Sequence, residues 1–180
     1  DREAWSERLD QEDSPTDYSL AQREAAPSAT AHRFALPVDM SLQEAIVEVA
    51  RGEGAQWPTG VVAAVGSYLS RALGLPQAGF GVPQMNRALS GAPRVAARTG
   101  CTAVNVLPVH VSALTRPQEQ VRQVRDQMVF NHEHALARQE DLERQAARRG
   151  GRAFGAQINV VPFDAVLRFG PCRAQGHNVS

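Results

Sequence analysis

The stretch that decides the fold is Thr99 to His110, which reads T-G-C-T-A-V-N-V-L-P-V-H. Its β-branched residues favour a buried strand. Asn105 lies inside this run, and a buried amide is costly unless its polar atoms find hydrogen-bond partners. Pro108 cannot donate a ladder hydrogen bond, which predicts a strand edge, a bulge or a bend. We therefore expect a strand that breaks at the wall of a cleft; the alternative is that Asn105 is a purely structural hydrogen-bonding residue.

A second stretch, Phe154 to Phe163, has the same pattern and reads F-G-A-Q-I-N-V-V-P-F. Its Asn159-Val-Val-Pro162 repeats Asn105-Val-Leu-Pro108. Two strands that each carry a central Asn and a following Pro predict neighbouring elements that bend at one rim. Shorter strands are expected at 32–37 and at 78–82, and one or two more at 166–180.

Two helices are predicted ahead of the central strand. Ser41 and Glu44 have capping-box spacing, so a helix should follow and end at Gly52 or Gly54; its expected buried stripe is Leu42, Ala45, Ile46 and Val49. A second helix begins at Pro58 and ends at Gly74. Its expected inner residues include Val61, Val65, Tyr68 and Leu69. Its internal Gly60 and Gly66 each cost about 1 kcal/mol relative to Ala, which indicates close packing against a neighbour.

The longest predicted helix follows the central strand. Thr115 is the expected cap, Pro117 lies in the first turn, and the helix runs to about Arg148. Val121, Val124 and Met128 supply its inner face, Leu136 and Leu142 continue that face, and Gln, Glu and Arg form the outer face. Residues 1–10 predict a short helix with Trp5 and Leu9 on one side. Residues 11–31 lack periodicity and are typical of a linker. Together the elements predict an α/β fold with a mixed sheet flanked by at least three helices.

Composition narrows the class of protein. The chain has 180 residues, of which 43% are hydrophobic, and this is enough to form a core. Its formal net charge is zero, so electrostatics does not predict binding to nucleic acid or to an anionic membrane. All 19 basic residues are arginine, which excludes lysine chemistry and is typical of a GC-rich bacterial genome. Cys101 and Cys172 suggest reduced, buried thiols in a cytoplasmic protein. No run is long enough to span a bilayer, and the chain is interpreted as a piece of a longer polypeptide.

The sequence has few features of known catalytic motifs. There is no glycine-rich phosphate loop and no G-x-S-x-G elbow. His132 and His134 are two residues apart and would point in different directions on a helix, so a metal site is not predicted. Cys101 is interpreted as an inert thiol. His110 and His177 are expected to be structural, and Arg87 to make an ordinary salt bridge, with binding of a carboxylate or phosphate as the alternative.

Several stretches in register resemble the condensation domains of nonribosomal peptide synthetases. Gly81 to Arg87 is similar to that family's G-x-P-x-x-x-R segment, and Asn105 to His110 to its V-N-x-x-P-x-R strand. The remaining matches are His134 to Leu142 with H-Q-x-x-x-x-E-D-L, Phe154 to Asp164 with F-G-P-x-V-N-x-x-P-F-D, His177 to Ser180 with H-N-x-S, and Trp5 with the tryptophan between the two lobes.

This resemblance implies a two-lobed fold of the chloramphenicol acetyltransferase-like superfamily. The family joins an acyl or peptidyl thioester on one carrier protein to an amine on the next, and both substrates ride on phosphopantetheine arms in a tunnel between the lobes. The family's catalytic motif, H-H-x-x-x-D-G, lies in the N-terminal lobe and is absent from residues 1–180. The chain thus resembles the C-terminal lobe, with 1–31 as lead-in and linker and 32–180 as a partial lobe. We assign it no catalytic residue, no metal and no cofactor of its own, and expect the piece alone to be inactive.

The expected partners are carrier protein domains and the missing N-terminal lobe, without nucleic acid or membrane. Asn105, Asn159, Arg87, His110 and Pro108 are the candidates for the substrate tunnel or lobe interface. His110 stands where the family has Arg, Ala135 replaces its Gln, Ala137 its tyrosine and Asn86 a glycine. The N-V-L-P form resembles members of siderophore assembly that use aryl-acid donors. The alternatives are a non-catalytic carrier-docking module and an epimerising or ester-forming relative.

Overall fold

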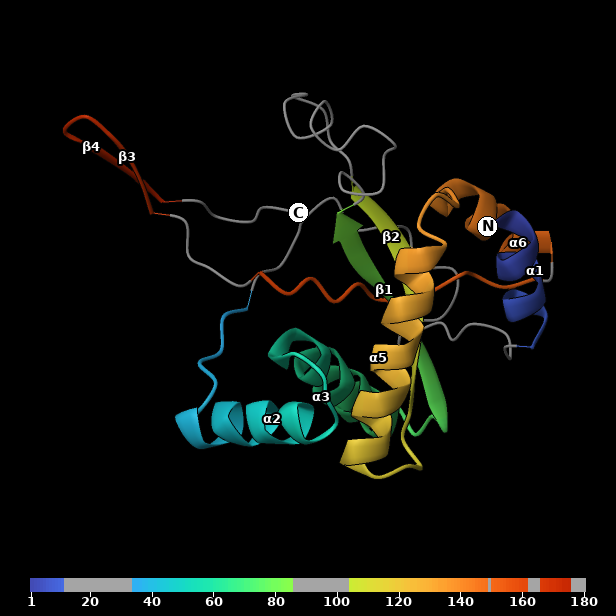
Figure 1. Cartoon of the computed structure of the whole chain (residues 1–180), viewed down its shortest axis with the longest axis horizontal. Coiled ribbons are helices and arrows are strands. Elements are labelled where there is room, and N and C mark those ends of the chain that lie inside the picture. Colours follow the sequence, from blue (N-terminus) through green and yellow to red (C-terminus); the bar gives the residue numbers. More distant parts are fainter. Residues whose placement is uncertain (12–33, 86–103, 149, 162–165, 176–180) are drawn as a thin grey trace.

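The computed structural model describes residues 1–11, 34–85, 104–148, 150–161 and 166–175. Helices and strands alternate irregularly along these residues (Figure 1). In chain order the elements are α1 (Arg2–Gln11), α2 (Met40–Gly52), α3 (Trp57–Ala72), β1 (Gln77–Met85), β2 (Val104–Ser112), α5 (Pro117–Glu133), α6 (Gln139–Arg148), β3 (Val166–Phe169) and β4 (Cys172–Gln175).

The central sheet is built on β1 and β2. These strands are antiparallel over nine residue pairs, from Gln77 opposite Ser112 to Met85 opposite Val104. On the other side of β1, Gly81 forms a parallel bridge with Gln157. One antiparallel and one parallel neighbour make the sheet mixed, which confirms the predicted fold class. The predicted strand at Phe154 to Phe163 is wrong in its extent, because within its described part only Gln157 forms a bridge, and the hydrogen bonds to β1 are limited to residues 155–158.

The main core lies between α3, the sheet and α5. It is made of Ala50, Val62, Ala63, Ala78, Phe80, Val82, Val109, Val111, Val121, Val124 and Ile158, all buried. The prediction of close packing at the helix glycines is confirmed. A Cβ on Gly66 would lie 2.5 Å from Cγ2 of Val111, and one on Gly60 would lie 2.9 Å from Cγ2 of Ile46. Glycine therefore lets α3 approach both β2 and α2.

A second core cluster lies at the other end of β2. It joins α1, α6 and the segment after α6, and consists of Trp5, Leu9, Leu107, Ala135, Leu142, Ala146, Ala153 and Phe154. The predicted short helix at the start of the chain is confirmed, and both Trp5 and Leu9 are buried. Leu136, in contrast, is exposed, so the predicted inner face does not continue through it.

The predicted helix from Thr115 to Arg148 is in fact two helices, with a turn at 134–138 between α5 and α6. The reason is the side chain of Asn105, whose Nδ2 donates to the carbonyl oxygens of Ala135 and Ala137. In a continuous helix those oxygens would accept from N–H groups four residues later. The N–H of Gln139 instead donates to Oδ1 of Asn105 at 3.2 Å.

Two predicted helix caps are also wrong. The N-cap of α2 is Asp39, whose Oδ1 accepts from the N–H of Ser41 at 2.8 Å, so Ser41 lies inside the helix. The carboxylate accepts a charge-assisted bond, which holds the pKa of Asp39 below its ordinary value through hydrogen bonds with Ser41. The N-cap of α5 is Arg116 rather than Thr115, without a side-chain cap bond, and Pro117 begins the helix as predicted.

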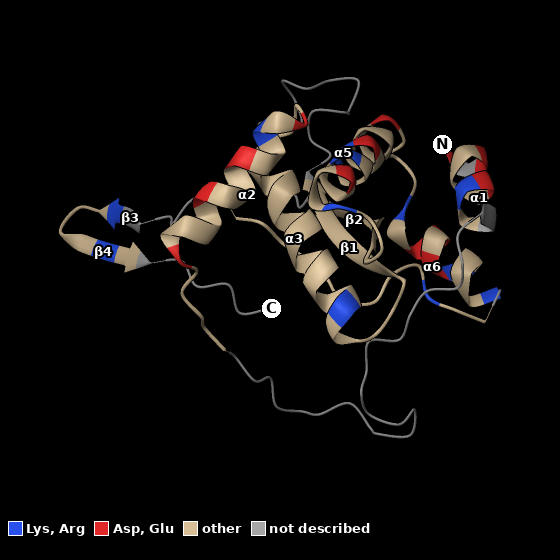
Figure 2. Ribbon diagram, turned by 90° about the horizontal axis from the view of Figure 1, so that it is seen from below, with Lys and Arg blue, Asp and Glu red and all other residues tan. Residues whose placement is uncertain are grey.

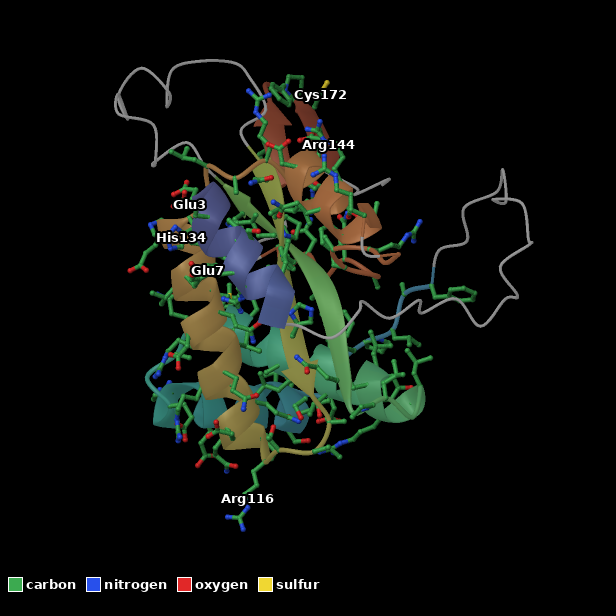
Figure 3. All side chains as sticks on the ribbon, turned by 90° about the vertical axis from the view of Figure 1, so that its right-hand side faces the viewer. Glu3, Glu7, Arg116, His134, Arg144 and Cys172 are labelled. Carbon is green, nitrogen blue, oxygen red and sulfur yellow. The ribbon has the colours of Figure 1, made fainter. Side chains whose placement is uncertain are left out.

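One expected strand and two expectations about burial are also wrong. The strand expected at 32–37 is absent from its described part, since residues 34–39 form no strand and Phe34 and Leu36 are largely exposed; residues 32–33 lie outside the described residues. The expected buried stripe of α2 is open at Leu42, and that of α3 at Val65 and Tyr68. Cys172 is a free and exposed thiol (Figure 3), while Cys101 lies outside the described residues. The predicted strands after residue 165 are confirmed as the antiparallel β3–β4 hairpin, which projects away from the body in Figure 1.

Candidate functional site

The outer edge of β2 is covered by side-chain amides of α5. The N–H of His110 donates to Oε1 of Gln127 at 2.8 Å, and Nε2 of Gln127 donates back to the carbonyl oxygen of His110 at 2.7 Å. Two turns away on the same helix, Nε2 of Gln120 donates to the carbonyl oxygen of Ser112. These bonds satisfy backbone groups of β2 that would otherwise need a neighbouring strand as a hydrogen-bond partner.

The backbone of Pro108 makes only one of the two kinds of hydrogen bond that His110 makes with α5. Nδ2 of the fully buried Asn131 donates to the carbonyl oxygen of Pro108 at 2.9 Å, but Oδ1 of Asn131 has no hydrogen-bond partner. Proline has no N–H to offer it. The proline therefore lies at the strand edge, where no ladder N–H is needed. The predicted break is wrong, because β2 continues without interruption from Val104 to Ser112.

The strand register explains why these groups face outward. Gly79 lies opposite His110 and Gly81 opposite Pro108. In both pairs the backbone groups point away from the partner strand, as in the non-hydrogen-bonded pairs of an antiparallel ladder. On the β1 side the carbonyl oxygen of Gly79 accepts from the N–H of Gly155 at 3.2 Å, and the N–H of Gly81 donates to Ala156 at 2.9 Å. Helix amides thus satisfy one edge of the strand pair and chain backbone the other.

Glycine in β1 makes room for large side chains. A Cβ on Gly79 would lie 2.7 Å from Nε2 of His110, and one on Gly81 would lie 2.5 Å from the ring of Phe154. The side chain of His110 is buried. It lines a shallow polar cleft of about 470 Å³ together with Arg8, Gln77, Ser112, Thr115, Gln123, Asp126 and Gln127. Gly81 thus leaves room for an aromatic ring of the same chain.

Asn105 lies at the opposite end of β2 from Ser112, with its amide directed at the α5–α6 turn. It donates to two carbonyl oxygens and accepts one N–H, so three hydrogen bonds engage its side chain. This arrangement favours the bracing alternative for Asn105. Asn159 is different, because its side chain is exposed and lies beyond the bridge at Gln157, on the far side of β1. Asn105 and Asn159 therefore differ in both position and environment, although their sequence patterns are the same.

α1 packs against the end of α5 through aromatic contacts. Nε1 of Trp5 donates to the carbonyl oxygen of His134 at 3.0 Å, and its ring meets that of Phe130 edge-on, with centroids 5.1 Å apart. The guanidinium of Arg8 lies 4.5 Å from the centre of the Phe130 ring. Figure 3 shows His134 at the end of α5 beside α1. Nδ1 of His134 lies 3.3 Å from Oδ1 of Asp1, so this histidine is a structural contact.

The predicted site residues are thus only partly brought together. Asn105, Pro108 and His110 share β2, Asn159 lies across β1, and Arg87 and His177 are outside the described residues. Sequence reasoning missed Gln120, Gln127 and Asn131, because the Gln-rich side of the helix was taken as its outer face. Their spacing of seven and four residues, which places them on one face, was the signal that could have found them.

No described residues form a group of three or more side chains suited to hold a metal ion. None of the helices described is long and apolar enough to cross a membrane. The candidate site around β2 thus has three features: side-chain amides that bond to the strand backbone, the buried His110 and a shallow polar cleft.

Comparisons with known proteins identify the class of protein to which the chain is similar. No protein-family model matches the chain. The first condensation domain of the calcium-dependent antibiotic synthetase superposes with a TM-score of 0.71 at 24% identity, over 97% of this chain and 38% of that one. A variant of the starter condensation domain of rhizomide synthetase, in complex with C8-CoA and Leu-SNAC, gives a TM-score of 0.73 at 25% identity, over 98% of this chain and 39% of that one. The fold is therefore that of part of a condensation domain.

Two curated proteins extend the comparison to whole synthetases. The chain is 31% identical over 184 residues to a dimodular nonribosomal peptide synthase of Bacillus subtilis (strain 168), and 30% identical over 184 residues to an isonitrile lipopeptide synthase of Streptomyces coeruleorubidus. It spans 8% and 12% of their lengths. The resemblance drawn from the motifs is confirmed: the chain is a relative of nonribosomal peptide synthetase condensation domains and matches a partial region of them.

Proposed function

We propose that the chain is part of a condensation domain that forms an amide between a carrier-bound acyl or peptidyl thioester and a carrier-bound aminoacyl amine. The observation that carries this proposal is the match, over 98% of the chain, to the starter condensation domain in complex with C8-CoA and Leu-SNAC. The proposed cofactor is the phosphopantetheine of the partner carriers.

The reaction is an aminolysis. The amine nitrogen attacks the thioester carbonyl carbon, and the C–N bond forms as the C–S bond breaks. The nitrogen loses a proton to a base, and the leaving pantetheine thiolate takes up this proton to become the thiol. Such a step depends chiefly on positioning two reactants and excluding water. The base would belong to the H-H-x-x-x-D-G motif in the N-terminal lobe, beyond this chain.

Under this proposal, residues 1–180 provide a rigid wall and no reacting group. Asn105 braces the α5–α6 turn, and Gln127 holds the edge of β2 at His110. Asn159 remains the stronger candidate for a contact at the tunnel or lobe junction, because its side chain is exposed. Arg87 is retained as a candidate on its motif alone. A donor of the aryl-acid type, as in siderophore assembly, rests only on the N-V-L-P form at Asn105 to Pro108.

The test uses the longer polypeptide that contains this chain and two separately loaded carrier proteins. We expect mass spectrometry to find the amide product on the acceptor carrier, and no product from residues 1–180 alone. Binding of both carriers without any product from the longer polypeptide would instead support the docking module. An inverted acceptor stereocentre or an ester product would identify the epimerising or ester-forming relative.

A further inference from the structure

The β3–β4 hairpin carries two arginines at facing positions. Its strands are antiparallel, with Arg168 opposite Arg173 and Phe169 opposite Cys172. The two-residue turn is Gly170-Pro171, and the φ of 60° at Gly170 is one that glycine adopts without strain. Arg168 and Arg173 are the only charged residues in β3 and β4, and they are the blue segments of this hairpin in Figure 2.

The register brings the two arginine side chains close together across the hairpin. With a two-residue turn, the pair next to the turn, Phe169 and Cys172, is of the hydrogen-bonded kind, and the following pair alternates with it. Arg168 and Arg173 therefore form a non-hydrogen-bonded pair, in which side chains lie closer to each other. Like charges that lie directly opposite each other in this way destabilise a strand pair.

Nothing in the described part of the chain offsets this repulsion. Both arginines are exposed, and among the described residues no hydrogen bond or ion pair engages either guanidinium group. The hairpin also forms a sheet of its own with only two strands, an arrangement that is marginally stable in water. An anion bound between the two guanidinium groups would remove the repulsion and hold the strands together, so the pair fits an anionic partner.

Two guanidinium groups at one position favour a phosphate group over a carboxylate. One guanidinium can occupy both oxygens of a carboxylate in a bidentate pair, which leaves the second arginine without an acceptor. The oxygens of a phosphate group are arranged tetrahedrally and can accept hydrogen bonds from two guanidinium groups at once. A phosphodiester retains two such oxygens and one negative charge.

We propose that Arg168 and Arg173 together bind the phosphodiester that attaches the pantetheine arm to a partner carrier protein. The inference rests on the proposed function, which supplies the arm, and it adds the residues that hold the phosphate of the arm. The hairpin projects away from the body of the molecule in Figure 1, so both side chains are open to a partner. No bond is made or broken here; the arginines position the arm through charge-assisted hydrogen bonds.

The test measures binding rather than catalysis. The longer polypeptide is prepared with Arg168→Gln, with Arg173→Gln and with neither change. Titration calorimetry gives the dissociation constant of each for holo-carrier and for apo-carrier, which lacks the arm. Arg116→Gln is the matched control, because Arg116 is an exposed arginine that lies at the opposite end of the molecule from Cys172 in Figure 3. Far-UV circular dichroism and urea unfolding verify the fold of every variant.

We expect each glutamine variant at 168 or 173 to bind holo-carrier about tenfold more weakly than the unchanged protein, since a charge-assisted hydrogen bond to the phosphate is lost. The affinity for apo-carrier should stay the same, and Arg116→Gln should change neither affinity. Without carrier, both hairpin variants should be at least as stable to urea as the unchanged protein, because the repulsion between the strands is removed.

Unchanged affinity for holo-carrier in both variants would overturn the proposal. So would an equal loss for holo-carrier and apo-carrier, because the arginines would then contact the protein surface of the carrier. A lower stability of both variants without carrier would identify a bracing role in the fold and overturn it as well. If the unchanged polypeptide binds holo-carrier through these arginines but forms no amide, the proposed function fails and this inference stands; amide formation with binding that is independent of the arginines gives the reverse result.

Discussion

The side-chain amide of Gln127 makes both of its hydrogen bonds to the backbone of one residue, His110, at 2.8 and 2.7 Å. An amide has the same donor and acceptor as a peptide group, so a glutamine on α5 can replace a strand at the edge of β2. The consequence is that helix and sheet are joined by polar contacts as well as by the apolar core.

Replacing Gln127 by leucine is expected to lower the free energy of unfolding by about 2 kcal/mol or more, since a backbone donor and a backbone acceptor in a buried position both lose their partner. Urea unfolding measures the change. Gln123→Leu is the matched control, because among the described residues the amide of Gln123 donates to the side chain of Glu119 and to no backbone group, and we expect a change below about 0.5 kcal/mol. Equal losses in the two variants would show that the bonds to His110 contribute little.

Pro108 and Asn131 should be coupled. Pro108→Ala creates an N–H that Oδ1 of Asn131 can accept, at the cost of a more flexible unfolded chain. We expect Pro108→Ala to be more favourable, by about 1 kcal/mol, with Asn131 present than in the Asn131→Leu background. A double-mutant cycle of unfolding free energies measures this coupling. A coupling of zero would mean that the new N–H does not reach Asn131.

Asn105→Ala should loosen the turn between α5 and α6. The carbonyl oxygens of Ala135 and Ala137 lose their donor, and the N–H of Gln139 loses its acceptor. We expect faster hydrogen exchange in 134–139 and a loss of about 1–3 kcal/mol. Amide formation by the longer polypeptide should slow only as far as folded protein is lost. Slower turnover with unchanged exchange and stability would return Asn105 to the substrate tunnel.

Gly66→Ala is expected to destabilise the protein by about 1–3 kcal/mol through overpacking, although alanine is the better helix former. The new Cβ would lie 2.5 Å from a methyl group of Val111, inside the core. Gly52→Ala is the control, since Gly52 ends α2 and a Cβ there meets no atom within 4 Å. Thermal unfolding should show a lower melting temperature for the first variant and an equal or higher one for the second.

The Asp39 cap gives a pH dependence of known sign. Its folded-state pKa lies below the ordinary value of 3.8, mainly because of the hydrogen bonds with Ser41. The stabilisation is therefore present above pH 3.8 and is lost as the pH falls through the lower, folded-state pKa. Asp39→Asn keeps a neutral cap, so the melting temperatures of the two proteins should converge as the medium becomes more acidic. A constant difference down to the most acidic pH would contradict this assignment.

Much of the fold could be predicted because periodicity is a local signal. The helix at 57–72, the strand at 104–112 and the close packing of Gly60 and Gly66 all follow from residue spacing and backbone cost. The helix break at 134–138 could not be predicted in this way, since its cause is an amide that lies 30 residues earlier in the chain. The exposure of Asn159 and Tyr68 could not be predicted from the sequence either, because burial depends on which surfaces pack together in the tertiary structure.

In the candidate site too, some features follow from the sequence and others only from the tertiary structure. Sequence alone placed Asn105, Pro108 and His110 on one strand and linked five motifs to one family, because side-chain type and order along the chain carry that information. Only the tertiary structure decided that Gln127 and Asn131 form the edge of this strand, that Asn105 ends a helix, and that the helical faces at Leu42 and Tyr68 are open. These outcomes depend on contacts between residues distant in sequence, whose partners no local pattern specifies.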